Sequence, residues 1–319
     1  MNDQHLPAPP LIDDLVRLAP HGGPVTVLKD TRVLIVRVGD VVIKAHPPGT
    51  GEHDMRRRLE VAGRLPGLML APLDLVHLDG RIVTIWPAGR ALTAGDLESG
   101  DMPWEEGGWL LAGLHAAPLP ADMPPAGGPD RAARAVAELA EVDAPAEILK
   151  AYETLPEFPP AGPGRRALTH GDWHLGQLVF HAGAWLLIDP DDLGAGDPVW
   201  DLARPAAWFA AGLLEPDMWH RFLSAYLSAG GSAVSREDPW RELDLPARAL
   251  TVQLAATATV TARRSGNPLD ETAEALIASC GRIVAAAGAT REGEVFDGVS
   301  QVPGPHADVR PQRNPHRAV

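Results

Sequence analysis

Three oxygen-bearing side chains follow one another in an order that suits phosphoryl transfer. Asp172 and Gln177 lie in the segment from Leu168 to Gln177, and Asp189 follows Leu187-Ile188. A phosphoryl-transfer site needs an oriented hydroxyl and divalent cations on the nucleotide phosphates, with little covalent chemistry from the protein. The spacing therefore predicts a carboxylate base, followed by an amide and a carboxylate that bind a metal.

A short hairpin is expected to bring two of these groups together. The runs 178–181 and 184–188 are apolar and long enough for two strands joined at Ala182-Gly183. Such a hairpin returns Asp189 to the side of Gln177. Mg²⁺ prefers oxygen ligands and usually keeps several waters, so one amide, one carboxylate and the nucleotide phosphates can complete its shell.

The histidines and aspartates near this segment also have other interpretations, as zinc ligands or as helix caps. His170 and His174 are four positions apart, as in a zinc pair, but Gly171 between them disfavours a helix and no third ligand has a matching spacing. Asp197 and Asp201 are of a type that caps helices, and Asp201 lies near a predicted helix start. We therefore treat His170, His174 and Asp197 as supporting residues. A metal-dependent hydrolase built on these residues would act without nucleotide.

The combined motif resembles that of a known family. His170-Gly171-Asp172 with His174, Gln177 and the later Ile188-Asp189 is similar to the signature H-G-D-x-H-x-x-N and I-D of the aminoglycoside phosphotransferase and choline kinase-like family. The segment from Gly196 to Ala203 resembles the same family's G-D-P-x-x-D-L-A. The resemblance is specific over residues 168–204 and weak elsewhere.

The resemblance implies a role for each residue of the trio. Asp172 would be the catalytic carboxylate, Gln177 the first Mg²⁺ ligand and Asp189 the second, with ATP or GTP as the phosphate donor. The family most often has Asn where this sequence has Gln177, which keeps the amide oxygen and adds a methylene. Some sugar-phosphorylating branches also carry Gln here, which favours a sugar or amino-sugar acceptor.

The fold implied is α+β and bilobal, like that of protein kinases, with a small antiparallel-sheet N-lobe and a larger, mostly helical C-lobe. The division would be residues 1–86, 87–290 and a flexible tail at 291–319. Runs 25–28, 32–38 and 41–45 are rich in β-branched residues, and Gly39-Asp40 joins the last two. Lys44 resembles the kinase lysine that holds the phosphates, and Glu60, in a predicted helix over 52–64, is placed to pair with it.

Two further segments would contact the nucleotide. The strand Ile82 to Trp86 ends in a Pro/Gly turn and resembles the linker that hydrogen-bonds adenine, so the stretch from Trp86 through Ala88 to Gly89 would line the base pocket. No glycine-rich loop joins the first two strands, which leaves Lys29-Asp30-Thr31 or Gly22-Gly23 to cover the phosphates. Periodicity predicts helices over 104–115, 131–142, 146–155, 202–211, 216–229, 245–264 and 270–287.

Composition fits one bilobal enzyme inside the cell. The chain has 319 residues, of which 45% are hydrophobic, and its single cysteine, Cys280, excludes an internal disulfide. Nothing at the N-terminus resembles a signal peptide, and no apolar run approaches the about 20 residues of a membrane span. We expect a cytoplasmic monomer or homodimer with neither a membrane nor a nucleic acid as partner.

The acceptor is predicted to be a small molecule, because the long activation segment and the Ala-Pro-Glu and His-Arg-Asp signatures of protein kinases are absent from the sequence. The net charge of −14 favours an amine-bearing acceptor. Carboxylates that could attract it are Glu215, Asp217, Glu237, Asp238, Glu242, Glu271 and Glu274, and tryptophans that could stack on it are Trp173, Trp200, Trp208 and Trp219.

The sequence therefore predicts ATP- and Mg²⁺-dependent O-phosphorylation of an aminoglycoside or other antibiotic, an amino sugar or a sugar. Asp172, Gln177, Asp189 and Lys44 would carry the reaction. The alternative is a non-catalytic protein that binds a nucleotide or another ligand and retains the kinase-like fold.

Overall fold

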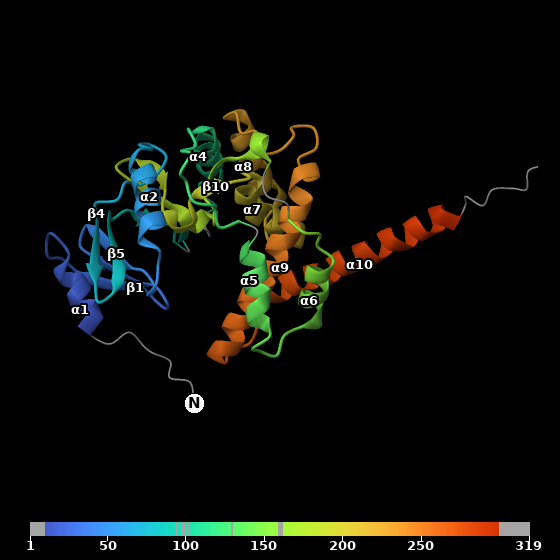
Figure 1. Ribbon diagram of the computed structural model, residues 1–319, viewed down its shortest axis with the longest axis horizontal. Helices are drawn as coiled ribbons and strands as arrows, with labels where there is room; N and C mark the ends of the chain where they lie inside the picture. Colours follow the sequence, from blue (N-terminus) through green and yellow to red (C-terminus); the bar gives the residue numbers. More distant parts are fainter. Residues whose placement is uncertain are drawn as a thin grey trace, which may run out of the picture.

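The molecule consists of a sheet-bearing lobe and a larger helical lobe, as predicted for an α+β bilobal fold (Figure 1). The computed structural model describes residues 10–93, 95–96, 100, 102–128, 130–158 and 162–299. A five-stranded antiparallel sheet has the order β1-β2-β3-β5-β4. Its strands are β1 (Val25–Asp30), β2 (Leu34–Val38), β3 (Val41–Ala45), β4 (Asp74–Leu78) and β5 (Arg81–Pro87).

The β2–β3 hairpin forms where its turn residues predict it. Gly39 has φ 58°, a left-handed conformation that suits a two-residue hairpin turn beginning with glycine. One face of the hairpin packs against α1 (Pro10–Arg17), whose Leu11 and Leu15 lie four residues apart and join a cluster with Val36 and Ile43. The sequence analysis did not predict α1 or β4.

Helix α2 (Glu52–Gly63) packs against β5. Its buried Met55 and Leu59 form a cluster with Ile82 and Trp86. Because these two residues are one turn apart, they define the side of α2 that faces the sheet.

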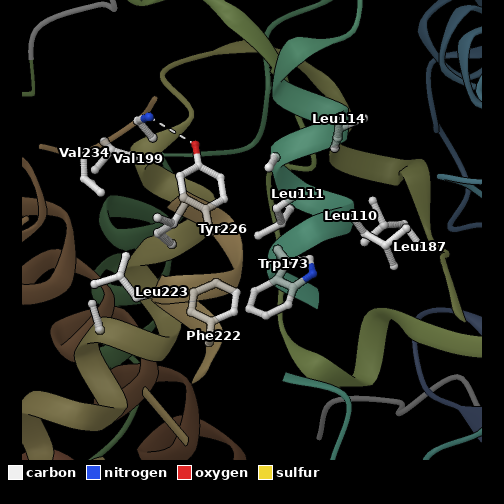
Figure 2. Packing of buried hydrophobic residues seen from close by; sticks show 14 of the residues in the cluster. Leu110, Leu111, Leu114, Trp173, Leu187, Val199, Phe222, Leu223, Tyr226 and Val234 are labelled. Carbon is white, nitrogen blue, oxygen red and sulfur yellow. Dashed lines mark hydrogen bonds between the residues drawn. The ribbon is translucent and has the colours of Figure 1, made fainter. Parts of the chain in front are cut away.

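The helical lobe surrounds the predicted catalytic segment. Helices α4 (Trp104–Ala116), α7 (Val199–Ala211), α8 (Pro216–Ser228) and α9 (Trp240–Ser265) form its centre, with α5 (Asp130–Leu139), α6 (Ala146–Glu153) and α10 (Glu271–Val299) beside them. Figure 2 shows Trp173, from the catalytic segment, lying between α4 and α8. Its ring stacks on Phe222 with centroids 4.9 Å apart. Burial of this indole therefore fixes the loop next to Asp172.

Two small sheets hold the rest of the catalytic segment. Strand β7 (Ala167–Thr169) pairs with β10 (Gly194–Gly196), and β8 (Leu178–His181) pairs with β6 (Arg90–Ala91) and β9 (Ala184–Leu187). The predicted turn at Ala182-Gly183 has φ 49° and 88° at its two central residues, the geometry of a type I′ hairpin.

The C-terminal helix differs from the prediction. Helix α10 continues to Val299, where a helix ending near position 287 and a flexible tail from 291 were expected. No proline interrupts the chain between 271 and 299, so the four glycines at 281, 288, 293 and 298 only weaken helix propensity. Positions 300–319 of the predicted tail lie outside the described residues.

The expectation that no apolar run approaches the length of a membrane span was wrong for part of α10. The segment Glu271–Ala289 is long enough and apolar enough to cross a membrane by length and composition alone, and 22% of it is buried in the protein. Its buried Leu276, Cys280 and Ile283 pack in a cluster with residues of α6 and α9. Length and hydropathy are weak evidence for a membrane contact in such a helix.

Candidate active site

The loop that carries Asp172 is held by a buried carboxylate. Asp201, on the first turn of α7, accepts the backbone N–H of His170 at 2.6 Å and that of Gly171 at 2.8 Å. Burial raises the pKa of Asp201, but hydrogen bonds from His115 and Gly171 lower this pKa by more, so it lies below its ordinary value. The sequence suggested a helix cap; instead, the Asp201 carboxylate fixes the catalytic loop.

A chain of hydrogen bonds connects Asp201 to α4 and α8. His115 Nε2 lies 3.0 Å from Asp201 Oδ2, and His115 Nδ1 lies 2.9 Å from the hydroxyl of Tyr226. A carboxylate only accepts, so Nε2–H donates to Asp201 and a neutral His115 accepts from Tyr226 at Nδ1. The Tyr226 oxygen in turn accepts the backbone N–H of Ala233 at 3.1 Å, the dashed line in Figure 2.

Gly171 allows this loop to approach the segment after Asp189. Its φ is 83°, a left-handed conformation. A Cβ atom here would overlap the carbonyl oxygen of Asp192, in the short helix η3 (Pro190–Asp192). Glycine is therefore required both by the backbone conformation and by the available space.

Asp172 lies between two arginines. Arg204 donates to its Oδ1 at 2.7 Å, and Arg131 donates to its Oδ2 at 2.8 Å. A carboxylate has about four lone-pair sites, so two acceptor sites remain for a substrate hydroxyl. These two arginines were not predicted from the sequence. Arg131 lies on the first turn of α5, and Arg204 is three residues after Asp201.

The β8–β9 hairpin brings Gln177 and Asp189 to one cavity. Leu178 pairs with Leu187, and the carbonyl of Gln177 accepts the N–H of Ile188 at 2.9 Å. Both Gln177 and Asp189 line a cavity of about 430 Å³ between the lobes. Asp189 has φ 61°, a left-handed conformation that Asp tolerates better than most residues. An amide oxygen and a carboxylate in one cavity fit the ligand set that Mg²⁺ prefers.

Asp172 opens onto a different space. It lines a separate cavity of about 10 Å³ together with Trp173, Trp200 and Arg204. The structure therefore brings the two predicted metal ligands to one cavity, whereas the predicted base lines another.

Lys44 reaches the same cavity from the sheet. It pairs with Asp189 and, at 2.7 Å, with Asp191. Burial lowers the pKa of Lys44, but the charges of Asp189 and Asp191 raise it by more, so the ammonium is held above its ordinary pKa. Lys44 therefore lies beside Asp189, the carboxylate that was predicted to bind the metal.

The predicted pair between Lys44 and Glu60 is wrong. Glu60 pairs with Arg57 at 3.0 Å, and its side chain is 55% exposed. Glu60 follows Leu59, which faces the sheet, and successive residues on a helix point about 100° apart, so Glu60 points away from the cavity. Asp191 takes its place and lies 3.4 Å from the ring of buried His46. The available signal in the sequence was a pair of carboxylates, Asp191 and Asp192, two and three residues after Asp189.

Of the residues predicted to line a base pocket, Trp86 and Gly89 line the inter-lobe cavity and Ala88 does not. Trp86 is buried, lines the cavity and donates its indole N–H to Thr84 at 2.9 Å. The N–H of Ala88, however, donates to the carbonyl of Asp40 at 2.7 Å. The carbonyl of Ala88 accepts from His181 Nδ1 at 3.1 Å. The backbone groups of Ala88 are therefore already used within the protein.

The neighbours of Ala88 are better placed to contact a base. Pro87 and Gly89 both line the cavity. Because Ala88 and Asp40 form a hydrogen-bonded pair, the adjacent pair of Pro87 and Val41 is a non-hydrogen-bonded one, and the Pro87 carbonyl points away from β3.

The β1–β2 hairpin covers the cavity without glycine. Leu28 and Lys29 line it, consistent with the first of the two predicted phosphate covers. Gly22-Gly23 is not that cover, because Gly23 packs at the opposite end of the hairpin, where a Cβ atom would lie 2.7 Å from Cα of Gly39.

The three supporting residues have structural contacts. His170 Nε2 lies 2.8 Å from the carbonyl of Ile188 and therefore donates to it, and His174 Nδ1 accepts the N–H of Gly176 at 3.0 Å. Burial, with a smaller contribution from the charge of Arg204, lowers the pKa of His174 to about 4. Asp197 accepts hydrogen bonds from Nε and Nη2 of Arg165, at 2.7 and 3.0 Å.

A zinc site is not formed by these histidines. Within the part of the chain that the structure describes, no three His, Cys, Asp or Glu side chains are grouped to hold a metal. This leaves the hydrolase alternative without a metal site of that kind.

A third cavity, of about 600 Å³, lies beyond Arg131. It is bounded by α5, the C-terminal half of α9 and the β1–β2 turn, and shares Arg131 and Gln253 with the small cavity at Asp172. None of the acidic residues predicted to attract an amine lines any of these three cavities. Of the four tryptophans, Trp219 is buried in the core, and Trp173 and Trp200 reach the small cavity.

A family model described as the phosphotransferase enzyme family, APH, matches residues 25–245. The chain belongs to this family. Among curated proteins, none matches the chain significantly in sequence.

Solved structures of similar fold include small-molecule kinases. A choline/ethanolamine kinase family protein from Mesorhizobium loti has a TM-score of 0.57 at 19% identity, covering 86% of this chain and 96% of its own. A thermostable mutant of the aminoglycoside phosphotransferase APH(4)-Ia, in ternary complex with AMP-PNP and hygromycin B, has a TM-score of 0.57 at 16% identity, covering 88% and 99%. Plasmodium vivax ethanolamine kinase has a TM-score of 0.55 at 14% identity, covering 83% of each chain. At these identities the likeness establishes the kinase-like fold of this family member.

Proposed function

We propose that this family member transfers the γ-phosphoryl group of ATP to a hydroxyl of a small molecule, with Mg²⁺ as cofactor. The observation that carries the proposal is the convergence of Lys44, Gln177 and Asp189 on one inter-lobe cavity. A structural neighbour bound to AMP-PNP and hygromycin B supports a nucleotide and a small acceptor as ligands of the two sides of the site.

Each residue has a role in this proposal. Lys44 holds the nucleotide phosphates, and Gln177 and Asp189 supply two oxygen ligands to the metal. Bound Mg²⁺ would neutralise charge on the β- and γ-phosphates. Trp86 packs on the base, and Pro87 and Gly89 contact its edge.

Asp172 orients the acceptor hydroxyl and accepts its proton. The hydroxyl oxygen forms the new bond to the γ-phosphorus while the bond to the ADP oxygen breaks. Arg131 and Arg204 fix both carboxylate oxygens, so the free lone pairs of Asp172 point in a defined direction.

The cavities give no support to the expectation that the acceptor carries an amine. The amine was inferred from the net charge of the whole chain, and the carboxylates cited for it lie away from the three cavities. The proposal is therefore limited to a small hydroxylated compound, which includes sugars and antibiotics. We also propose a cytoplasmic location.

Replacing Asp172 tests the proposed base. In Asp172→Asn, turnover of a verified acceptor should fall about 10²- to 10⁴-fold, the usual cost of losing a general base. Binding of ATP with Mg²⁺ should be unchanged, since Asp172 does not line the nucleotide cavity. The control is Glu237→Gln, which removes the same charge at an exposed position.

The acceptor for this assay comes from a screen of ATP consumption with aminoglycosides, other antibiotics, glucosamine, maltose and choline. Full turnover by Asp172→Asn would rule out the assigned base. Calorimetric binding of ATP and Mg²⁺ without transfer to any acceptor would instead favour the non-catalytic binding protein.

A further inference from the structure

The 600 Å³ cavity beyond Asp172 is rich in arginine. Its lining includes Arg32, Arg131, Arg134 and Arg264 against two acids, Glu138 and Asp192. The small cavity at Asp172 adds Arg204. Together the two cavities carry five arginines and three carboxylates, in a chain whose net charge is −14. The local charge is therefore opposite in sign to that of the whole protein.

Three of these arginines are already paired. Arg131 binds Asp172 and Asp192, Arg204 binds Asp172, and Arg264 binds Glu138 and Glu141 at 2.8 Å each. These pairs hold the cavity wall in shape and leave little positive charge for a ligand.

Arg32 and Arg134 are different. Neither has a hydrogen-bond or ion-pair partner among the residues described in the structure, and both are exposed on the cavity wall. Arg134 is three residues after Arg131 and so lies on the same side of α5, one turn farther from Asp172. The two arginines therefore place uncompensated positive charge on the wall of the 600 Å³ cavity, which shares Arg131 and Gln253 with the small cavity at Asp172.

Gln253 is a second and independent sign of a ligand. Its side chain on α9 is 5% exposed and lines both the 600 Å³ cavity and the small cavity at Asp172. Its Oε1 has no hydrogen-bond partner within the described residues. Leaving a buried amide oxygen unpaired is unfavourable, and a polar ligand in either cavity would remove that cost.

We propose that the 600 Å³ cavity binds the acceptor and that the acceptor carries a carboxylate or phosphate group in addition to its reactive hydroxyl. Arg134 and Arg32 bind the anionic group, and the Gln253 amide hydrogen-bonds a hydroxyl between that group and Asp172. The guanidinium fork matches the two oxygens of a carboxylate or phosphate. The identification of this ligand as the acceptor rests on the proposed function. The negative charge of the ligand is inferred from Arg32 and Arg134 alone.

The test uses one sugar ring with four substituents: glucose, glucosamine, glucuronate and glucose 6-phosphate. Binding to the full-length protein is measured by calorimetry in excess ADP and Mg²⁺, which occupy the nucleotide cavity. We expect glucuronate or glucose 6-phosphate to bind at least about tenfold more tightly than glucose, since one hydrogen bond to a charged group contributes about 1.5 to 3 kcal/mol. Glucosamine should bind most weakly. The two anions distinguish a carboxylate from a phosphate site.

Variants locate the bound anion. Arg134→Ala and Arg32→Ala should each weaken binding of the preferred anion about 10- to 100-fold and leave glucose unaffected. Arg241→Ala is the matched control, because Arg241 is exposed and lies at the other end of α9, about 35 Å from Arg264 by helix rise. Gln253→Leu should weaken the charged and the neutral sugars alike, since its amide contacts a hydroxyl.

Several outcomes would overturn the inference: glucosamine binding as tightly as the anions, no loss of anion binding in either arginine variant, or no binding by any of the four sugars. A parallel assay of ATP-dependent transfer separates this inference from the proposed function. Transfer only to glucose or glucosamine would contradict the anionic acceptor and leave the kinase activity standing. Arginine-dependent anion binding without any transfer would contradict the kinase activity and leave the ligand class standing.

Discussion

Protonation at single residues connects the stability of the catalytic loop to pH. His174 accepts a backbone N–H at Nδ1 and is partly buried near Arg204, so its neutral form is favoured and its pKa is lowered to about 4. In the unfolded chain the same imidazole titrates near its ordinary value of about 6.5. Between these two pH values the unfolded state binds more protons than the folded state.

This difference predicts that the protein loses stability as pH falls from about 6.5 to 4. The slope from His174 is at most about 1.4 kcal/mol per pH unit, and it vanishes above the unfolded pKa, where neither state is protonated. His174→Asn keeps an acceptor for the Gly176 N–H and cannot titrate, so its free energy of unfolding should change less over this range. Urea denaturation at several pH values measures this, with exposed His53→Asn as control. Equal slopes for wild type and His174→Asn would exclude the mechanism.

The elements of the site are fitted together through close backbone contacts. The catalytic loop after β7 and the turn of η3 approach so closely that Gly171 cannot carry a side chain. The β8–β9 hairpin and η3 then determine which carboxylates reach Lys44.

Two glycines test the close contact. Gly171 and Gly230 both have left-handed φ, 83° and 88°, but a Cβ on Gly230 would have no atom within 4 Å. Gly230→Ala should therefore cost only the conformational penalty of about 1 to 2 kcal/mol. Gly171→Ala adds a steric overlap with Asp192, and we expect a larger loss in the free energy of unfolding together with a loss of transfer activity. Similar losses in both variants by chemical denaturation would show that the contact with η3 is unimportant.

The ion-pair partner of Lys44 comes from η3 and not from α2, and this difference can be tested by mutation. Asp191→Asn removes one of the two ion pairs of Lys44 and should raise the KM for ATP about tenfold, the equivalent of 1.4 kcal/mol. Glu60→Gln should leave the KM within the error of the assay, because the ion-pair partner of Glu60 among the described residues is Arg57 on its own helix. The reverse order in steady-state kinetics would restore Glu60 to the site.

At the scale of the whole molecule, the inter-lobe cavity proposed to bind the nucleotide is built from both lobes. Lys44 and Trp86 come from the sheet, and Gln177 and Asp189 come from the hairpin of the helical lobe. A ligand that contacts both sides binds the folded chain only, so it stabilises the native state by mass action.

Saturation with ATP and Mg²⁺ should therefore raise the free energy of unfolding by about 2.7 kcal/mol at a ligand concentration of 100 times Kd. Removing Mg²⁺ with EDTA should abolish most of this gain. Thermal or urea unfolding with and without each component provides the measurement. In Asp189→Asn the part that depends on Mg²⁺ should disappear; if it persists, Asp189 is not a metal ligand.

The elements near the motifs were predictable because their signals are local. The β2–β3 hairpin at Gly39, the β8–β9 hairpin at Ala182-Gly183, and the order of Asp172, Gln177 and Asp189 all follow from neighbouring residues. Turn geometry and the two-residue period of a strand operate over a few positions. Helix α1 was missed, since its short apolar stripe is meaningful only against the sheet that covers it.

The sequence alone indicated the bilobal α+β fold, through the family resemblance of its motif, and the identity of the groups on the catalytic segment, since motif residues and their spacing are read directly along the chain. Tertiary structure decided the partners. Asp191 rather than Glu60 meets Lys44, and Arg131 and Arg204 meet Asp172, across separations of 147, 41 and 32 residues. Such pairings depend on the directions in which packed helices and turns project their side chains, and no local pattern encodes that geometry.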